Sequence, residues 1–528
     1  MNGKLSNVGV PFASLVNKGL MPADRELIDS ELPFFHKNPF QLGVASGDPR
    51  SDSVVLWTRL APEPLADDGF GGMPDREIPV QWEIATDQNF FEIVDSGTAR
   101  ALPELGHSVH VEVHQLQPKT YYYYRFKVGS ELSPVGRTKT VPSADDSIPS
   151  LTFALASCQA WYHGYYTAYQ YMAEEDLDLV FFQGDYIYEY AINESNLFRQ
   201  ADLSSHHNVK VKTLDQYRLR YALFKSDPDL QKAHAAFPWV TTWDDHEVEN
   251  NYAADKSQYD ATPRQFYQQK SDSYQAFYEN LPLRSTSIPY GPNLDLYQKI
   301  TYGNLAEFNV LDSRQYRDDI VSGDDDERFK PNRSILGYEQ EQWLYNNLKT
   351  SQARWNVLAQ QVPMAQVDRD PSPAKGFNMD KWDGYVANRE RVFSSFRENN
   401  VRNPVVLSGD IHRHAAANLK ADFNDPSSAN IGTEFVTSSI ASGKDGEVND
   451  EQERTALEEN DHLKLYRNQR GYVRCTVTPE EWQTDFLVVP YVTRPGAPLQ
   501  TLASYVVRDG ENTLQELETK TSVDAQNM

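Results

Sequence analysis

The stretch LDLVFFQGDYIYEY, residues 177–190, decides the fold class of this chain. It begins with a mostly apolar run of the length of a buried strand and passes directly into Gly184 and Asp185. A strand that is apolar on both faces is typical of a sheet covered by helices, with polar residues gathered just beyond the strand ends. The preceding segment, HGYYTAYQYMAEED at 163–176, has the apolar spacing of a helix. The sequence therefore predicts a layered α/β architecture around this strand.

The same shape recurs along residues 150–494. Each copy is a hydrophobic strand followed at once by polar, charged or small residues. The copies are LTFALASC (151–158), PWVTTWDDHE (238–247), EFNVLDSRQYRDD (307–319), WNVLAQQ (355–361), PVVLSGDIHRH (404–414) and TEFVTSSIAS (433–442). We assign residues 150–494 to one α/β domain and residues 495–528 to a polar C-terminal tail.

The first part of the chain has the pattern of short antiparallel strands. These strand-like segments are SVVLWTRL (53–60), IPVQWEIAT (78–86), SVHVEVHQL (108–116) and TYYYYRFKVG (120–129), separated by turn-forming residues. Such spacing is typical of a β-sandwich of roughly 100 residues. We expect a fibronectin- or immunoglobulin-like β-sandwich over residues 39–142, preceded by an extension at 1–38. The segment PSADDSIPS (142–150) is the expected linker to the second domain.

Composition limits the class of function. The 528 residues carry 76 acidic and 50 basic side chains, a net charge of −26, which argues against a nucleic-acid-coating surface. No stretch approaches the roughly 20 consecutive apolar residues that a membrane helix needs, so we expect no membrane span. The two cysteines, Cys158 and Cys475, cannot form a disulfide framework. The surplus of carboxylates leaves metal binding open, because hard metal ions are bound by carboxylate oxygens.

Candidate metal ligands follow four separate strands. The candidates are Cys158 after the first strand, Asp185 and Tyr188 after the second, Asp244 and Asp245 after the third, and Asp410 and His412 after the last. Each has an ordinary structural alternative, because buried cysteines are usually inert and Asp at a strand end often caps a helix. Together they have the acidic, imidazole and phenol ligands that a two-metal hydrolase requires. Four unrelated acidic turns are the competing interpretation.

These segments carry a family resemblance. The motifs are GVASGDPRSDSVVLWTRLAP (43–62), SCQ (157–159) with HGYY (163–166), GDYIYEY (184–190), TWDDHEVENNY (242–252), LDSRQYRDD (311–319), LAQQ (358–361), WDGY (382–385) and SGDIH (408–412). Their order and identity, from about Pro39 to Thr493, resemble the alkaline phosphatase D family. The resemblance implies a fibronectin-like N-terminal domain followed by a four-layer α/β calcineurin-like metallophosphatase domain.

The resemblance also implies a mixed metal centre of one Fe(III) and one or two Ca(II) ions. By motif, the iron ligands are Cys158, Asp185, Tyr188 and His412. Asp185 bridges to calcium, which Asp245 and Asp410 help to bind, and Asn250 and Asn251 are weaker candidates. These ligand types suit the ions, because Fe(III) takes phenolate and carboxylate and Ca(II) takes oxygen donors.

Three further residues are expected to act on the substrate. His246 resembles the histidine that approaches the substrate or leaving group in related phosphatases, and a supporting hydrogen bond is the alternative. Arg314 and Arg317 are expected to supply positive charge for a phosphate, with a solvated salt-bridge cluster as the alternative.

Other residues near these motifs have a less defined role. His163 is a further site candidate. Arg413 and His414 depart from the family pattern beside an intact Asp410-x-His412 pair, and His414 is a possible rival ligand.

The predicted function is a metal-dependent alkaline phosphatase. It would hydrolyse phosphomonoesters and phosphodiesters with a metal-activated hydroxide and release inorganic phosphate. A phosphodiesterase dedicated to phospholipids or teichoic acids is the alternative, and a binding module on an inactive metallophosphatase fold is a second. A serine hydrolase is disfavoured, because no G-x-S-x-G motif is found. The resemblance implies a secreted or periplasmic protein, although the N-terminus shows no leader. We expect a monomer that acts on phosphate-ester small molecules.

Overall fold

The computed structural model describes residues 35–259, 261–322 and 326–519. Within these ranges, 17 strands form one hydrogen-bonded sheet with two arms that share the long strand β19 (Leu463–Val477). The first arm contains β1 (Val44–Gly47), β2 (Val54–Arg59), β5 (Ser108–Val113), β9 (Leu151–Ala156), β10 (Leu179–Gln183), β11 (Pro238–Thr242), β20 (Glu481–Val489), β21 (Gln500–Arg508) and β22 (Gln515–Thr519). The second contains β12 (Gln298–Tyr302), β13 (Ala306–Val310), β14 (Trp355–Ala359), β15 (Pro404–Ser408), β16 (His414–Lys420) and β17 (Asn430–Val436). The two-residue β18 (Gly446–Glu447) pairs with β19.

The two arms pack face to face around one apolar core. Successive side chains of a strand point to opposite faces, so Phe153 and Phe181 enter the core between the arms. Their neighbours Ala154 and Val180 face the other side, where helices cover them. Because β9, β10 and β11 are parallel and buried on both faces, they are almost continuously apolar. The order helices, sheet, sheet, helices confirms the layered α/β architecture predicted from the sequence.

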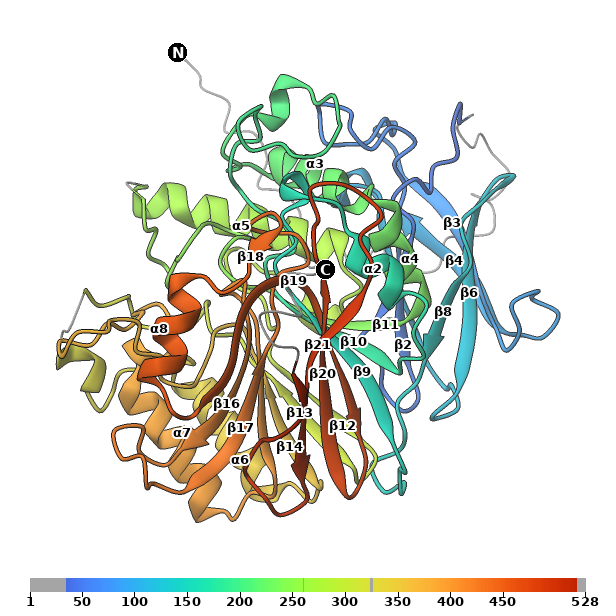
Figure 1. Cartoon of the computed structure of the whole chain (residues 1–528). Coiled ribbons are helices and arrows are strands. Elements are labelled where there is room, and N and C mark those ends of the chain that lie inside the picture. The colour runs from blue at the N-terminus through green and yellow to red at the C-terminus, as the bar shows by residue number, and fades with distance from the viewer. Residues whose placement is uncertain (1–34, 260, 323–325, 520–528) are drawn as a thin grey trace.

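Helices cover the outer face of each arm. The helices over the first arm are α2 (Thr167–Met172), α3 (Leu214–Lys225), α4 (Pro228–Ala236) and α5 (Pro263–Asn280). Those over the second are α6 (Tyr338–Thr350), α7 (Val386–Glu398) and α8 (Glu451–Glu459), in yellow to orange-red on the left of Figure 1. The helix predicted over 163–176 is shorter in the structure, where only α2 is helical.

The four strands predicted in the N-terminal part are all present, but they are divided between two sheets. A separate five-stranded sheet contains β3 (Ile78–Ala85), β4 (Ile93–Ala101), β6 (Tyr121–Val128), β7 (Glu131–Leu132) and β8 (Gly136–Lys139), and its blue strands lie on the right of Figure 1. It packs against β1, β2 and β5 through one apolar cluster. These three strands belong to the large sheet, because β1 pairs with β11 in parallel. The N-terminal layers are therefore continuous with the sheet that carries the site.

The segment predicted as a C-terminal tail contributes a strand to the core. β21 pairs with β20 on one side and β22 on the other, and Leu502 and Tyr505 are buried between the two arms. Six consecutive residues of QTLASYVVR, from Leu502 to Val507, are buried, so the strand lies inside the protein. Residues 1–34 and 520–528, at the ends of the predicted extension and tail, lie outside the described residues.

The composition led us to expect no membrane span and no disulfide framework. In the described ranges no helix is long and apolar enough to cross a membrane. Cys158 and Cys475 are both buried and free, so they do not form a disulfide.

Candidate metal centre

The carboxyl ends of four strands bring the predicted ligands together. Cys158 follows β9, Asp185 follows β10, Asp245 follows β11, and Asp410 and His412 follow β15. The first three strands are parallel neighbours in one arm, and β15 comes from the facing arm. The site therefore lies where the ends of both arms meet, as expected for polar residues beyond parallel strands.

The backbone turns sharply at four of these ligands. Residues with positive φ are Cys158 (59°), Asp185 (59°), Asp410 (68°) and His412 (54°). Non-glycine residues adopt this left-handed conformation at a cost, and such strain is concentrated at functional sites. Gly184 (φ 93°) allows the ends of β10 and β11 to approach closely, because an added Cβ would lie 2.3 Å from the backbone nitrogen of Asp244.

One group of ligands combines a thiol, a carboxylate, a phenol and an imidazole. Single ligand atoms of Cys158, Asp185 and His412 all lie within 4.8 Å of one another. The Tyr188 hydroxyl donates to Asp185 Oδ2 (2.7 Å) and lies 3.0 Å from His412 Nε2. Ser442 Oγ donates to the same hydroxyl (2.8 Å). All four residues that were predicted to hold iron are therefore adjacent.

Two further groups are connected to the first, the second through Asp185 and the third through the Asp245 that it shares with the second. Asp185, Asp245 and His246 form one group, and Asp244, Asp245 and Asp410 form the other, each with ligand atoms within 4.8 Å. Asp185 belongs to two of the three groups, which is the position that a bridging carboxylate needs. The three groups are contiguous, so they offer room for more than one cation.

Several buried carboxylate oxygens lack a hydrogen-bond donor in the described structure. These are Oδ1 of Asp185, Oδ2 of Asp244 and Oδ1 of Asp245. Burying a carboxylate oxygen without a partner is costly, so such groups are usually paired or bind metal. The donor set of thiol, phenol, imidazole and carboxylates is of the kind that binds metal ions.

Burial and neighbouring charges shift the pKa values of these groups. Burial raises the pKa of Asp245, and Arg314 opposes this effect. Burial and the charge of Asp185 raise the pKa of both the Cys158 thiol and the Tyr188 phenol well above their usual values. A bound cation has the opposite effect and lowers the pKa of both groups, because it favours the thiolate and the phenolate.

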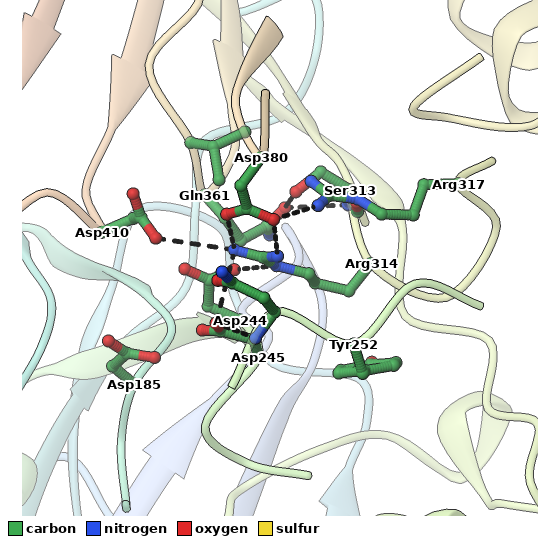
Figure 2. A network of polar contacts seen from close by, with 12 residues as sticks. Asp185, Asp244, Asp245, Tyr252, Ser313, Arg314, Arg317, Gln361, Asp380 and Asp410 are labelled. Carbon is green, nitrogen blue, oxygen red and sulfur yellow. Dashed lines mark hydrogen bonds and ion pairs between the residues drawn. The ribbon is translucent and has the colours of Figure 1, made fainter. Parts of the chain in front are cut away.

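Arg314 is the centre of the polar network in Figure 2. Its Nη1 and Nη2 donate to the two oxygens of Asp380 (2.7 and 3.0 Å), and its Nε donates to Asp244. Its Nη2 also lies 3.5 Å from Asp410 and 3.8 Å from Asp245. The guanidinium therefore contacts four carboxylates at once, two of which are predicted calcium ligands, and its single charge offsets only part of theirs.

Arg317 is held by the same carboxylate. Its Nη1 donates to Asp380 (2.7 Å) and its Nε donates to the backbone oxygen of Ser313 (2.6 Å). The side chains of Arg314 and Arg317 are both 0% exposed. In this arrangement both predicted phosphate-binding arginines are buried within the protein, where they contact carboxylates, a backbone carbonyl and, for Arg317, the ring of Tyr385 at 5.3 Å. They are not in the solvated cluster that was the alternative.

His246 is fixed by a carboxylate on one side of its ring. Its Nδ1 lies 2.7 Å from Glu189 Oε2, and its ring centroid is 4.3 Å from that of Tyr188. Burial opposes the charged form, but Asp245, Asp185 and Glu189 together raise the pKa of His246 well above its usual value. These carboxylates favour the charged imidazole in the metal-free arrangement, in which His246 is itself a member of the candidate group with Asp185 and Asp245.

The weaker candidates have distinct positions. The backbone nitrogens of Asn250 and Asn251 donate to Glu189 (3.0 Å) and Asp245 (2.6 Å) respectively. Nδ1 of His163 accepts a hydrogen bond from the Gly443 nitrogen (3.1 Å). His414 is fully buried and its Nδ1 accepts from the Ser438 nitrogen (3.1 Å), and it is absent from the three groups found in the described residues.

Arg413, the other departure from the family pattern, is directed away from the ligands. It pairs with Asp450, whose side chain caps the first turn of α8 by accepting from the Glu453 nitrogen (2.8 Å). Its guanidinium lies 5.1 Å from the ring centroid of Tyr466. Arg413 therefore connects the strand-end loop to α8.

Two residues that support the ligands had no role assigned to them from the sequence. The carboxylate of Glu247 accepts from the backbone nitrogens of Asp185 (3.2 Å) and Asp244 (2.8 Å), and so joins the ends of β10 and β11. Arg470 donates to the backbone oxygen of His412 (2.8 Å). Glu247 stands inside the DDHE motif, but Arg470 lies in the middle of a strand and had no recognisable signal.

Comparisons with known proteins agree with this geometry. Residues 153–486 match the family model of the PhoD-like phosphatase, and residues 29–142 match that of the PhoD-like phosphatase N-terminal domain. The chain is 52% identical over 494 residues to a protein named alkaline phosphatase D from Bacillus subtilis (strain 168), covering 93% of this chain and 84% of that protein. A solved structure described as "Structure of PhoD" superposes with a TM-score of 0.89 at 51% identity and covers 93% of this chain and 94% of that one.

Proposed function

The chain belongs to the PhoD-like phosphatase family and is an alkaline phosphatase, and we propose that metal ions held at the converging strand ends activate the water that attacks the phosphate ester. The observation that carries the proposal is the set of three contiguous ligand groups, which share Asp185 and Asp245. We also propose that the four-layer domain is of the calcineurin-like type and that the N-terminal layers form a fibronectin-like sandwich.

The proposed ligands are those named from the sequence motifs. Cys158, Asp185, Tyr188 and His412 would hold Fe(III), and Asp185, Asp245 and Asp410 would hold Ca(II). When bound, such ions polarise phosphoryl oxygens and lower the pKa of a bound water. The unpaired buried oxygens of Asp185 and Asp245 support this assignment, because a cation would satisfy both.

His246 is the proposed proton donor to the leaving group. Hydrolysis forms a bond from the water oxygen to phosphorus and breaks the bond to the ester oxygen, which must gain a proton when the alcohol is a weak acid. Because Nδ1 is engaged by Glu189, Nε2 is the ring nitrogen left to give that proton. The resulting products are the alcohol and inorganic phosphate, with no covalent phosphoenzyme.

The site of action and assembly are also proposals. The family resemblance favours an exported protein. We infer the monomeric state and the phosphate-ester substrates from the same resemblance. Phospholipid and teichoic acid remain substrates to be tested beside simple esters.

Substitution of Asp185 tests the proposed function directly. Asp185→Asn removes the charge of the residue common to two ligand groups, so metal content and hydrolysis of p-nitrophenyl phosphate should fall together. Asp368→Asn, at a buried carboxylate outside these groups, is the matched control. Retained turnover in Asp185→Asn would overturn the proposal. A parallel panel of the monoester, its bis ester and a phospholipid would define the substrate range.

A further inference from the structure

A phosphate ester in a protein of net charge −26 needs a cation that can reach its oxygens. Arg314 was expected to supply that charge. In the structure its guanidinium is fully buried and neutralises Asp380, Asp244 and neighbouring carboxylates. Arg317 is equally buried and shares Asp380. Neither guanidinium is therefore exposed to a substrate, which leaves room beside the proposed metal ions for another cationic side chain at the phosphate.

Lys381 lies at the edge of the same network. Its Nζ is 2.8 Å from Asp380 Oδ2 and also contacts Asp410 Oδ2. Unlike the two arginines, its side chain keeps 11% of its surface exposed. It also lines a small cavity of about 30 Å³ with Asn378, Ile411 and Tyr466. Lys381 is thus adjacent to a predicted metal ligand and is partly exposed.

The position of Asp380 explains how this lysine is held in place. Figure 2 shows the carboxylates of Asp380 and Asp410 both directed toward the Arg314 guanidinium, where they contact the same nitrogen, Nη2. Lys381 follows Asp380 in the chain and pairs with both carboxylates, so its ammonium is directed toward Asp410 rather than away from the site. An ammonium on a four-carbon stem carries three donors and reorients easily, so it can exchange a carboxylate partner for a phosphoryl oxygen.

We propose that Lys381 is the cationic side chain that contacts the phosphoryl oxygens of the substrate. The inference rests on the proposed function, because it places the phosphate beside Asp410. In the substrate complex the ammonium donates to an anionic phosphoryl oxygen while Asp380 retains the two arginines. The competing role is that of a fixed counter-ion to Asp410, which would affect metal binding and leave phosphate recognition unchanged.

Phosphate binding separates these two roles. Lys381→Met keeps most of the stem and removes the charge, whereas Lys381→Arg keeps the charge. Lys375→Met, at an exposed lysine of the same connecting segment whose Nζ donates to the Asn424 side chain (3.3 Å), is the matched control. Inorganic phosphate would be titrated calorimetrically into each metal-loaded protein, and KM and kcat would be measured with p-nitrophenyl phosphate.

The expected result is a selective loss of phosphate affinity. Loss of one charge-assisted hydrogen bond should weaken phosphate binding and raise KM by about tenfold or more in Lys381→Met. Lys381→Arg should stay within about threefold of the parent, since it can still donate to the anion. Iron and calcium content, measured by elemental analysis, should be the same in all four proteins.

Two results would overturn the inference. One is unchanged phosphate affinity in Lys381→Met. The other is a loss of calcium that accounts for the whole change in activity and phosphate binding. If Lys381→Met does not fold, as judged by circular dichroism, Lys381→Gln is measured by the same criteria. Failure of the proposed function would differ, because the parent protein would then lack bound metal or activity.

Discussion

The assignment of His246 as proton donor leads to a test based on leaving groups. His246→Asn removes Nε2 but keeps a side-chain NH₂ that can still donate to Glu189, which Nδ1 contacts at 2.7 Å in the parent. The substitution therefore separates proton donation from the supporting hydrogen bond. Since the ring also packs 4.3 Å from Tyr188, some loss of packing is expected in any assay.

The magnitude follows from the chemistry that Nε2 performs. General acid catalysis contributes about 10²- to 10⁴-fold, or about 3–5 kcal/mol in the barrier, when the leaving group needs a proton. An alkyl phosphate has such a leaving group, whereas p-nitrophenolate leaves without one. We expect kcat/KM of His246→Asn to fall by that factor for the alkyl ester and by about tenfold or less for the nitrophenyl ester.

The assay compares kcat/KM for a series of monoesters whose alcohols differ in pKa. Glu189→Gln is the companion variant, because it weakens the hydrogen bond to Nδ1 and leaves Nε2 in place. It should show a smaller loss with the same dependence on leaving group. An equal loss for all esters in His246→Asn would refute the assignment and make His246 a supporting residue.

Two other predictions concern the buried charges. Asp380→Asn leaves Arg314 and Lys381 without the carboxylate that pairs with both, so we expect a loss of about 3–5 kcal/mol in unfolding free energy, measured in denaturant, together with reduced calcium content; unchanged stability would contradict the network. Lys225 is buried with its Nζ 3.2 Å from the Tyr186 hydroxyl, and burial lowers its pKa well below the usual value, so Lys225→Met should raise the unfolding free energy at pH 7 by about 1–3 kcal/mol. The unfolded chain binds the proton that folded Lys225 has lost, so the stability of the parent should rise with pH up to about 10.5. This contribution should vanish in Lys225→Met. An equal rise in both proteins would contradict the explanation.

The strand-end motifs alone predicted part of the candidate metal-ligand groups, namely that Asp185 and Asp245 lie together. Asp185 and Asp245 each follow an apolar strand directly, and the carboxyl ends of parallel neighbours must meet. Bringing Asp410 and His412 to the same point depends on two sheet arms facing each other. That arrangement was implied by the family resemblance and not by local pattern.

The charge network could not be predicted from local pattern, because its members are distant in the sequence. Asp380 is 66 residues from Arg314 and follows no strand, so nothing in the sequence pairs them. The same limit applies to the strand β21, whose apolar residues sit among polar ones and were interpreted as a tail. Burial of Leu502 and Tyr505 becomes evident only when β20 offers an edge for pairing.

The central claim is that these strand ends hold iron beside calcium, and the most direct test is metal analysis combined with visible absorption. Protein purified without added metal should contain one iron and at least one calcium, and Tyr188 should give a phenolate-to-iron absorption band. Tyr188→Phe should lose the band, and chelation should abolish activity until calcium is restored. A colourless, iron-free protein with full activity would contradict the account.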